Sequence, residues 1–147
     1  MAHQFHPPVK NYEIIEHTAD IALRINSKDL PGLFRNAALA LFEISAKKNP
    51  SARNPKKETF SIKQKADTLD ELFINWLNEL LSLSAAKGLV FSDFKINSIN
   101  EKELEAFAVG EDARGFRLDK EIKAATYHGL KLTRSAGGWQ AEVILDV

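Results

Sequence analysis

The chain contains no cysteine, which excludes disulfide bonds, thiolate metal ligands and cysteine nucleophiles. Neither charge is in excess, because 20 lysines and arginines balance 20 aspartates and glutamates and give a formal net charge of zero. This balance argues against a nucleic-acid-binding protein that relies on a strong overall basic field, but it is compatible with a local basic patch. No apolar run approaches the roughly 18 residues that a membrane-spanning helix needs.

An ordinary globular composition remains, with 147 residues of which 44% are hydrophobic and 27% are charged. This length is enough for one domain with a sizeable core and not for two. Residues 1–10 lack the basic start and the apolar stretch of a signal peptide, so we expect a flexible extended tail there and a domain over residues 11–147. The absence of cysteine fits a reducing compartment, and we expect a cytoplasmic protein.

The hydrophobic pattern predicts an α+β fold, a single domain with a mainly antiparallel sheet and two principal helices packed on it. The expected order is two strands, a helix, a strand, a helix and four strands. The strands are expected over residues 12–16, 21–26, 59–63, 89–98, 103–110, 121–134 and 139–146.

Capping residues predict where the two helices begin and end. Asp29 can cap a first helix whose apolar face runs over residues 30–42. Thr68 and Glu71 form a capping box at the start of the second helix, and Gly88 ends it. The polar stripe of that second helix is expected to face solvent; its members are Glu71, Asn75, Asn78 and Ser82.

Two segments carry no recognisable pattern. Residues 47–57 hold prolines, asparagines and basic residues without periodicity, and this composition predicts a loop. Residues 110–120 likewise match no motif.

Acidic residues at the ends of two predicted strands give the best functional lead. Asp20 precedes the strand over residues 21–26, and Asp146 and Val147 close the last strand. If these strands are neighbours, two aspartates and the terminal carboxylate of Val147 converge on one spot. Carboxylates that close repel one another unless a cation or a proton intervenes, and oxygen ligands suit Ca²⁺ or Mg²⁺. The residues alone leave open that the aspartates only end their strands.

Two further residues invite a chemical role. His17 and Asp20 could form an acid–base pair, but no Gly-x-Ser-x-Gly elbow and no cysteine supplies a nucleophile beside them. Lys123 lies among small residues and can reach a phosphate or a partner's carboxylate, although an exposed lysine needs no such role. The sequence also has no glycine-rich phosphate loop.

Several motifs, in the right order, resemble the archease family from about Tyr12 to Val147. They are the opening Glu13-x-x-Glu16-His17-Thr18-Ala19-Asp20-Ile21, the helical segments 33–42 and 75–81 with the exit 87–92, the strand Ile122-Lys123-Ala124-Ala125-Thr126-Tyr127-His128-Gly129-Leu130, the pair Gly138-Trp139, and the closing Val143-Ile144-Leu145-Asp146-Val147. The family usually ends in Asp-Ile, so Val147 is a mild departure.

The resemblance implies a small cytoplasmic accessory protein rather than an enzyme. Its expected partner is the tRNA-splicing RNA ligase, whose guanylylation and multiple turnover it would promote, with at most an indirect contact to tRNA. The resemblance also implies a bound divalent metal, expected to be Ca²⁺, with Asp20, Asp146 and the carboxylate of Val147 as ligands. Lys123 and His17 are the residues expected to act in activation of the ligase.

Two other classes of function remain open at this point. One is a stand-alone metal-dependent phosphodiester hydrolase that uses Asp20, His17 and Asp146. The other is a chaperone-like adaptor for a tRNA-modifying enzyme. Turnover by the pure protein would support the first, and salt-dependent tRNA binding without a ligase would support the second.

Overall fold

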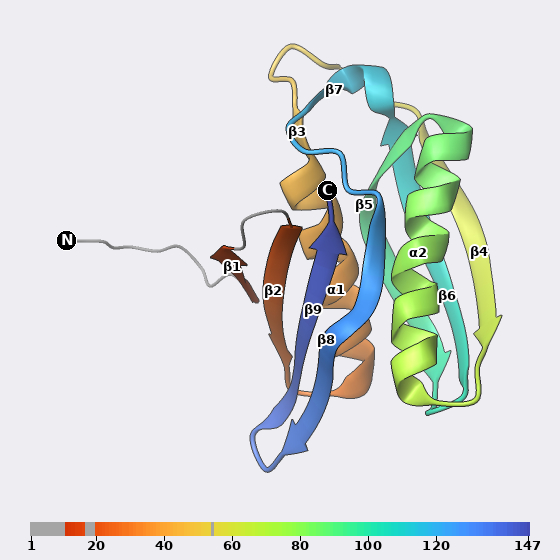
Figure 1. Cartoon of the computed structure of the whole chain (residues 1–147). Coiled ribbons are helices and arrows are strands. Elements are labelled where there is room, and N and C mark those ends of the chain that lie inside the picture. Colours follow the sequence, from red (N-terminus) through yellow and green to blue (C-terminus); the bar gives the residue numbers. More distant parts are fainter. Residues whose placement is uncertain (1–10, 17–19, 54) are drawn as a thin grey trace.

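Antiparallel sheets and two long helices form the part of the chain that the computed structural model describes, residues 11–16, 20–53 and 55–147 (Figure 1). A four-stranded sheet has the order β1 (Tyr12–Glu16), β2 (Asp20–Ser27), β9 (Gly138–Asp146) and β8 (Ala124–Ser135). A three-stranded sheet has the order β4 (Lys57–Lys65), β6 (Glu103–Asp112) and β5 (Leu89–Ile99). Every pairing in them is antiparallel, so the predicted α+β class is confirmed.

Both helices begin at the predicted caps. Asp29 Oδ1 accepts a hydrogen bond from Gly32 N at 2.8 Å ahead of α1 (Leu30–Ser45). Thr68 Oγ1 accepts from Glu71 N at 3.1 Å ahead of α2 (Leu69–Lys87). The returning bond of the capping box is displaced by one residue, because the Glu71 carboxylate accepts from the backbone of Asp67 instead of Thr68. None of the described helices is long and apolar enough to cross a membrane.

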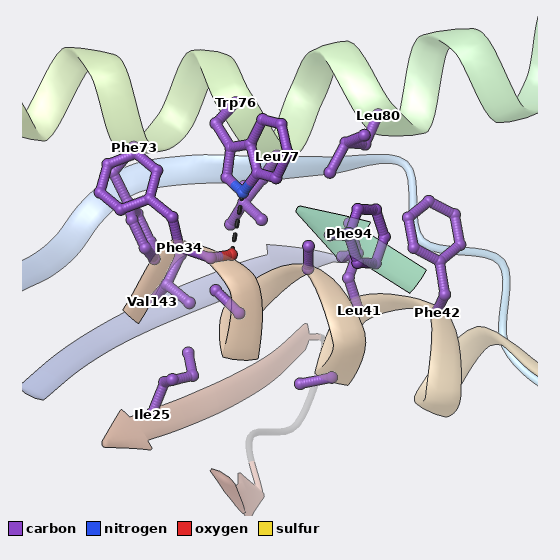
Figure 2. Packing of buried hydrophobic residues seen from close by; sticks show 14 of the residues in the cluster. Ile25, Phe34, Leu41, Phe42, Phe73, Trp76, Leu77, Leu80, Phe94 and Val143 are labelled. Atoms are coloured by element: carbon purple, nitrogen blue, oxygen red, sulfur yellow. Dashed lines mark hydrogen bonds between the residues drawn. The ribbon is translucent and has the colours of Figure 1, made fainter. Parts of the chain in front are cut away.

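Buried side chains from both helices and both larger sheets form one core, part of which Figure 2 shows. Phe34 on α1 meets Phe73 on α2 edge to face, with ring centroids 5.2 Å apart. Trp76 is fully buried, and its Nε1 donates a hydrogen bond of 2.9 Å to the backbone oxygen of Phe34. This bond satisfies the one polar atom of the indole and fixes the two helices to each other.

The predicted loop over residues 47–57 is wrong at both ends, because residues 46–48 are a strand and Lys57 already belongs to β4. β3 (Ala46–Lys48) pairs antiparallel with β7 (Phe116–Leu118), which lies in the second unassigned segment. A short 3₁₀ turn, Ala113–Gly115, leads into β7. Three-residue strands carry no readable periodicity, so only the long-range pairing reveals them.

The strand predicted over residues 121–134 starts three residues later and is interrupted. In β8, Thr126 faces Ile144 and Lys131 faces Glu142, so that the four residues 127–130 bulge out opposite one residue of β9. Gly129 in this bulge has a φ of +71°, a conformation that favours glycine. The bulge carries the side chain of Tyr127 out of the sheet, where 54% of the residue is exposed.

Candidate functional site

Asp20 and Asp146 lie directly opposite each other at one end of the four-stranded sheet. They are the first residue of β2 and the last residue of β9. Directly opposed residues of an antiparallel pair project from the same side of the sheet, with Cβ atoms about 4.5–5.5 Å apart. Since the adjoining Ile21 and Leu145 are buried in the core, the two carboxylates project from the opposite side, away from α1.

The cation nearest along this face of the two strands is committed elsewhere. Arg24 pairs with Glu13 across β1 at 3.2 Å and with Glu142 across β9 at 3.8 Å. It follows Asp20 by four residues, which is two side-chain positions along the same face. The ion pairs of Arg24 therefore lie farther along the face, with Glu13 and Glu142.

The aspartates alone make an incomplete cation site. No group of three or more histidine, aspartate or glutamate side chains close enough to hold a metal occurs in residues 11–16, 20–53 and 55–147. Val147 follows Asp146 directly in the chain and is 41% exposed. Carboxylate and main-chain oxygens are hard donors of the kind that Ca²⁺ takes, six to eight at a time with water among them.

Lys123 lies at the same end of the sheet as Asp146. It comes just before β8, and its N–H donates a hydrogen bond of 2.8 Å to the backbone oxygen of Asp146. The next residue, Ala124, faces Asp146 in the β8–β9 register. The Lys123 residue is exposed, so its ammonium group is available to a partner.

Asn78 on α2 fixes the start of β8, and here the expectation of a solvated polar stripe is wrong. Its Nδ2 donates to the backbone oxygen of Ala125 at 3.1 Å, and its Oδ1 accepts from the backbone N–H of Ala125 at 2.8 Å. Strand β8 is an edge of its sheet, so the amide takes the place of a further strand at this residue. Glu71 and Asn75 are also half-buried, and only Ser82 of the stripe is exposed.

The bulge in β8 faces the start of α2. Partial burial, followed by the negative charges of Glu71 and Asp70, raises the pKa of Tyr127. The described residues therefore place Asp20, Asp146, Lys123 and Tyr127 along one end and edge of the four-stranded sheet. His17 falls outside the described residues, so the predicted pairing of His17 with Asp20 stays a prediction.

The sequence predicted that the two aspartates meet if their strands are neighbours, and the β2–β9 pairing confirms that proximity, but the sequence did not predict the contacts around them. The aspartates were visible because they stand at the ends of alternating apolar segments. The Asn78 bridge depends on a partner 47 residues away, and the bulge depends on the pairing of β8 with residues 142–144 of β9. A single sequence carries no local signal for either contact. The glycine within an otherwise regular strand, Gly129, was the one available sign of the bulge.

Nearly the whole chain is similar to known proteins. Residues 12–147 match the model of the archease protein family. "Protein archease" from Methanosarcina barkeri is 36% identical over 144 residues, which cover 94% of this chain and 97% of that protein. "Protein archease" from Pyrococcus abyssi is 33% identical, with 95% and 100% covered.

Two solved structures resemble the fold. The solution structure of protein 1598 from Methanobacterium thermoautotrophicum matches with a TM-score of 0.73 at 30% identity, covering 95% of this chain and 100% of that one. The crystal structure of a Thermotoga maritima protein, described as an archease and a possible chaperone, matches with a TM-score of 0.62 at 25% identity, covering 99% and 100%.

Proposed function

Because the chain belongs to the archease family, we propose that it is a metal-binding accessory protein of an RNA ligase. In this role it promotes guanylylation of the tRNA-splicing RNA ligase, and so its multiple turnover, without itself catalysing a reaction. The observation that carries the proposal is the direct opposition of Asp20 and Asp146 at the end of the β2–β9 pair.

The donor set supports a divalent cation, with Ca²⁺ as the expected ion. Asp20 and Asp146 offer two carboxylates from the same side of the sheet, and the carboxylate of Val147 is proposed as the third. A hard cation such as Ca²⁺ stabilises two or three negative oxygen ligands that lie at one end of a sheet. When bound, such a cation supplies positive charge that neutralises a phosphate or a triphosphate.

The chain's own residues position the surface that meets the ligase. The backbone bond from Lys123 to Asp146 places the lysine at the same end of the sheet as the carboxylates, and the Asn78 bridge holds the following strand against α2. A partner that docks on this end of the sheet can therefore contact both Lys123 and the acidic pair. Phosphoryl transfer depends mainly on positioning and charge neutralisation, so an accessory protein can speed it without a covalent step.

The decisive experiment measures guanylylation and repeated turnover of the purified ligase with and without this chain. We expect stimulation by wild type, and loss of stimulation in both Asp20→Asn and Lys123→Ala. Only Asp20→Asn should also weaken Ca²⁺ binding measured by calorimetry, which separates the metal from the partner contact. Glu58→Gln, an exposed residue of β4, is the matched control for removal of one negative charge.

Several results would overturn the proposal. Full stimulation by Asp20→Asn would remove the metal site from the mechanism. Phosphodiester hydrolysis by the pure chain that disappears in Asp146→Ala would indicate a stand-alone hydrolase. A peptide extension after Val147 converts its carboxylate into a neutral carbonyl, so unchanged Ca²⁺ affinity in that form would exclude the terminal carboxylate as a ligand.

A further inference from the structure

The two segments that match no motif meet in space. Strand β3 pairs with β7, and the backbone N–H of Asn49 donates to the oxygen of Gly115 at 2.9 Å. Figure 1 shows both strands at the end of the molecule at which β9 also ends. We call residues 46–57 and 111–120, without residue 54, the basic pole.

The basic pole carries a net positive charge, although the net charge of the whole chain is zero. Its two segments contain eight lysines and arginines against three acidic residues. Because the whole chain is neutral, the remainder carries an equal excess of negative charge. The net charge of zero argues against an overall basic field, but the positive charge is distributed unevenly and is concentrated in the basic pole.

Each acidic residue of the pole is already paired within it. The buried carboxylate of Glu111 accepts a hydrogen bond from Lys48 Nζ at 2.9 Å. Burial opposes ionisation of Glu111, but hydrogen bonds from Lys48 and from Ser92 outweigh it and lower the pKa of this carboxyl. The Lys48 ammonium group thereby ties β3 to the end of β6.

The other two acids pair with nearby arginines. Asp112 lies 2.8 Å from the Arg114 guanidinium, and Asp119 lies 3.8 Å from that of Arg117. The five remaining cations form no ion pair with any described residue; they are Lys47, Arg53, Lys56, Lys57 and Lys120. The pole thus carries a net surplus of five positive charges, and of the five unpaired cations only Lys57 lies opposite an acidic residue of the pole, Glu111.

A cavity of about 380 Å³ opens between the two segments. Arg53 and Lys56 line it from one segment, with no ion pair to any described residue, and Phe116 lines it from the other. The acids that also line it are already paired, Glu111 with Lys48 and Asp112 with Arg114. A guanidinium offers a planar set of donors that matches two phosphate oxygens at once. The half-buried ring of Phe116 adds an apolar surface among the cations, the combination found where proteins bind single-stranded nucleic acid.

We propose that the basic pole binds the sugar-phosphate backbone of single-stranded RNA. A net surplus of five positive charges favours a partner whose negative charges are closely and regularly spaced, and an RNA strand has a phosphate at every nucleotide. To match the same spacing of charge, an acidic protein surface would have to place carboxylates side by side, and these repel one another. The inference rests on the charges and the cavity, and does not depend on the proposed ligase role.

The test uses the full chain alone and a fluorescein-labelled, unstructured single-stranded RNA of about 20 nucleotides, with binding followed by anisotropy. We expect a Kd of about 1–100 μM near 0.1 M salt, weakening steeply as salt rises. Arg53→Gln combined with Lys56→Gln should raise the Kd about tenfold or more. The same change should make the slope of log K against log salt shallower by about 1.4, or 0.7 for each lost phosphate contact.

A matched control separates the pole from overall charge. Lys63→Gln combined with Lys95→Gln removes the same charge from exposed positions on β4 and β5 of the three-stranded sheet. We expect its Kd to stay within about twofold of wild type, and equal melting temperatures in both double variants show that each folds. Lack of any binding at about 1 mM protein, ten times the highest Kd expected, or an equal loss in both variants, would overturn the proposal. Competition by polyglutamate as strong as by unlabelled RNA would assign the pole to an acidic protein instead.

Discussion

Replacement of Asn78 by alanine removes both hydrogen bonds that hold the start of β8 to α2. The change leaves the N–H and the C=O of Ala125 without partners, in a residue that is 3% exposed. Each unsatisfied buried backbone group costs about 1–3 kcal/mol. Asn78 is itself only half-buried, so water partly replaces the amide and the total should be about 2–4 kcal/mol.

Thermal and denaturant unfolding measure this loss directly. An unfolding entropy of about 2.1 cal/mol/K per residue gives about 0.3 kcal/mol/K for a chain of this length, so the melting temperature should fall by about 6–13 °C. Asn75→Ala is the matched control, because Asn75 lies on the same helix, is also half-buried, and makes no side-chain hydrogen bond with the described residues. We expect it to cost less than about 1 kcal/mol.

A local measurement makes the prediction sharper. In wild type, the amide hydrogen of Ala125 should exchange slowly with solvent, and in Asn78→Ala its exchange should accelerate more than that of Leu132 farther along β8. If Asn78→Ala and Asn75→Ala lose the same stability within about 0.5 kcal/mol, the amide bridge does not support the edge of the sheet.

Three further predictions concern the core, a turn and a buried ion pair. Trp76→Phe should lose about 2–3 kcal/mol in chemical denaturation, since it removes the hydrogen bond to Phe34 and part of the buried ring. Gly138→Ala should lower the free energy of unfolding by more than about 2 kcal/mol, because φ is +127° and an added Cβ would clash with the carbonyl oxygen of Ser27, the last residue of β2. An unchanged melting temperature would contradict this. The lowered pKa of Glu111 stabilises the folded state above the unfolded pKa near 4.5, and this contribution is lost as pH falls through the lowered value; Lys48→Met should flatten that part of the stability–pH curve.

The sequence was sufficient for the elements whose signals are local. Alternation in residues 103–110 and the spacing of apolar residues along α2 depend only on near neighbours, and both elements were placed to within two residues. Asp29, Thr68 and Gly88 marked helix ends because each acts on backbone atoms within four residues.

Features formed by distant partners could not be predicted in this way. The pairing of β3 with β7 joins residues about 70 positions apart, and neither strand is long enough to show a period. Glu111 is buried and pairs with Lys48, and the composition of a lysine-rich loop does not indicate which lysine reaches it. Likewise, the sequence predicted that Asp20 and Asp146 face each other only if β2 and β9 are neighbours, because each segment alone shows only where its aspartate lies in its own strand.

Strand order also determines when the four-stranded sheet can form during synthesis of the chain. More than a hundred residues separate Ser27 of β2 from its partner Trp139 of β9. While the ribosome makes the intervening residues, β2 has only β1 beside it, and one edge of an apolar strand stays open. The nascent chain must therefore keep β2 from pairing with other chains until β9 leaves the exit tunnel, and the two aspartates come together only at that last step.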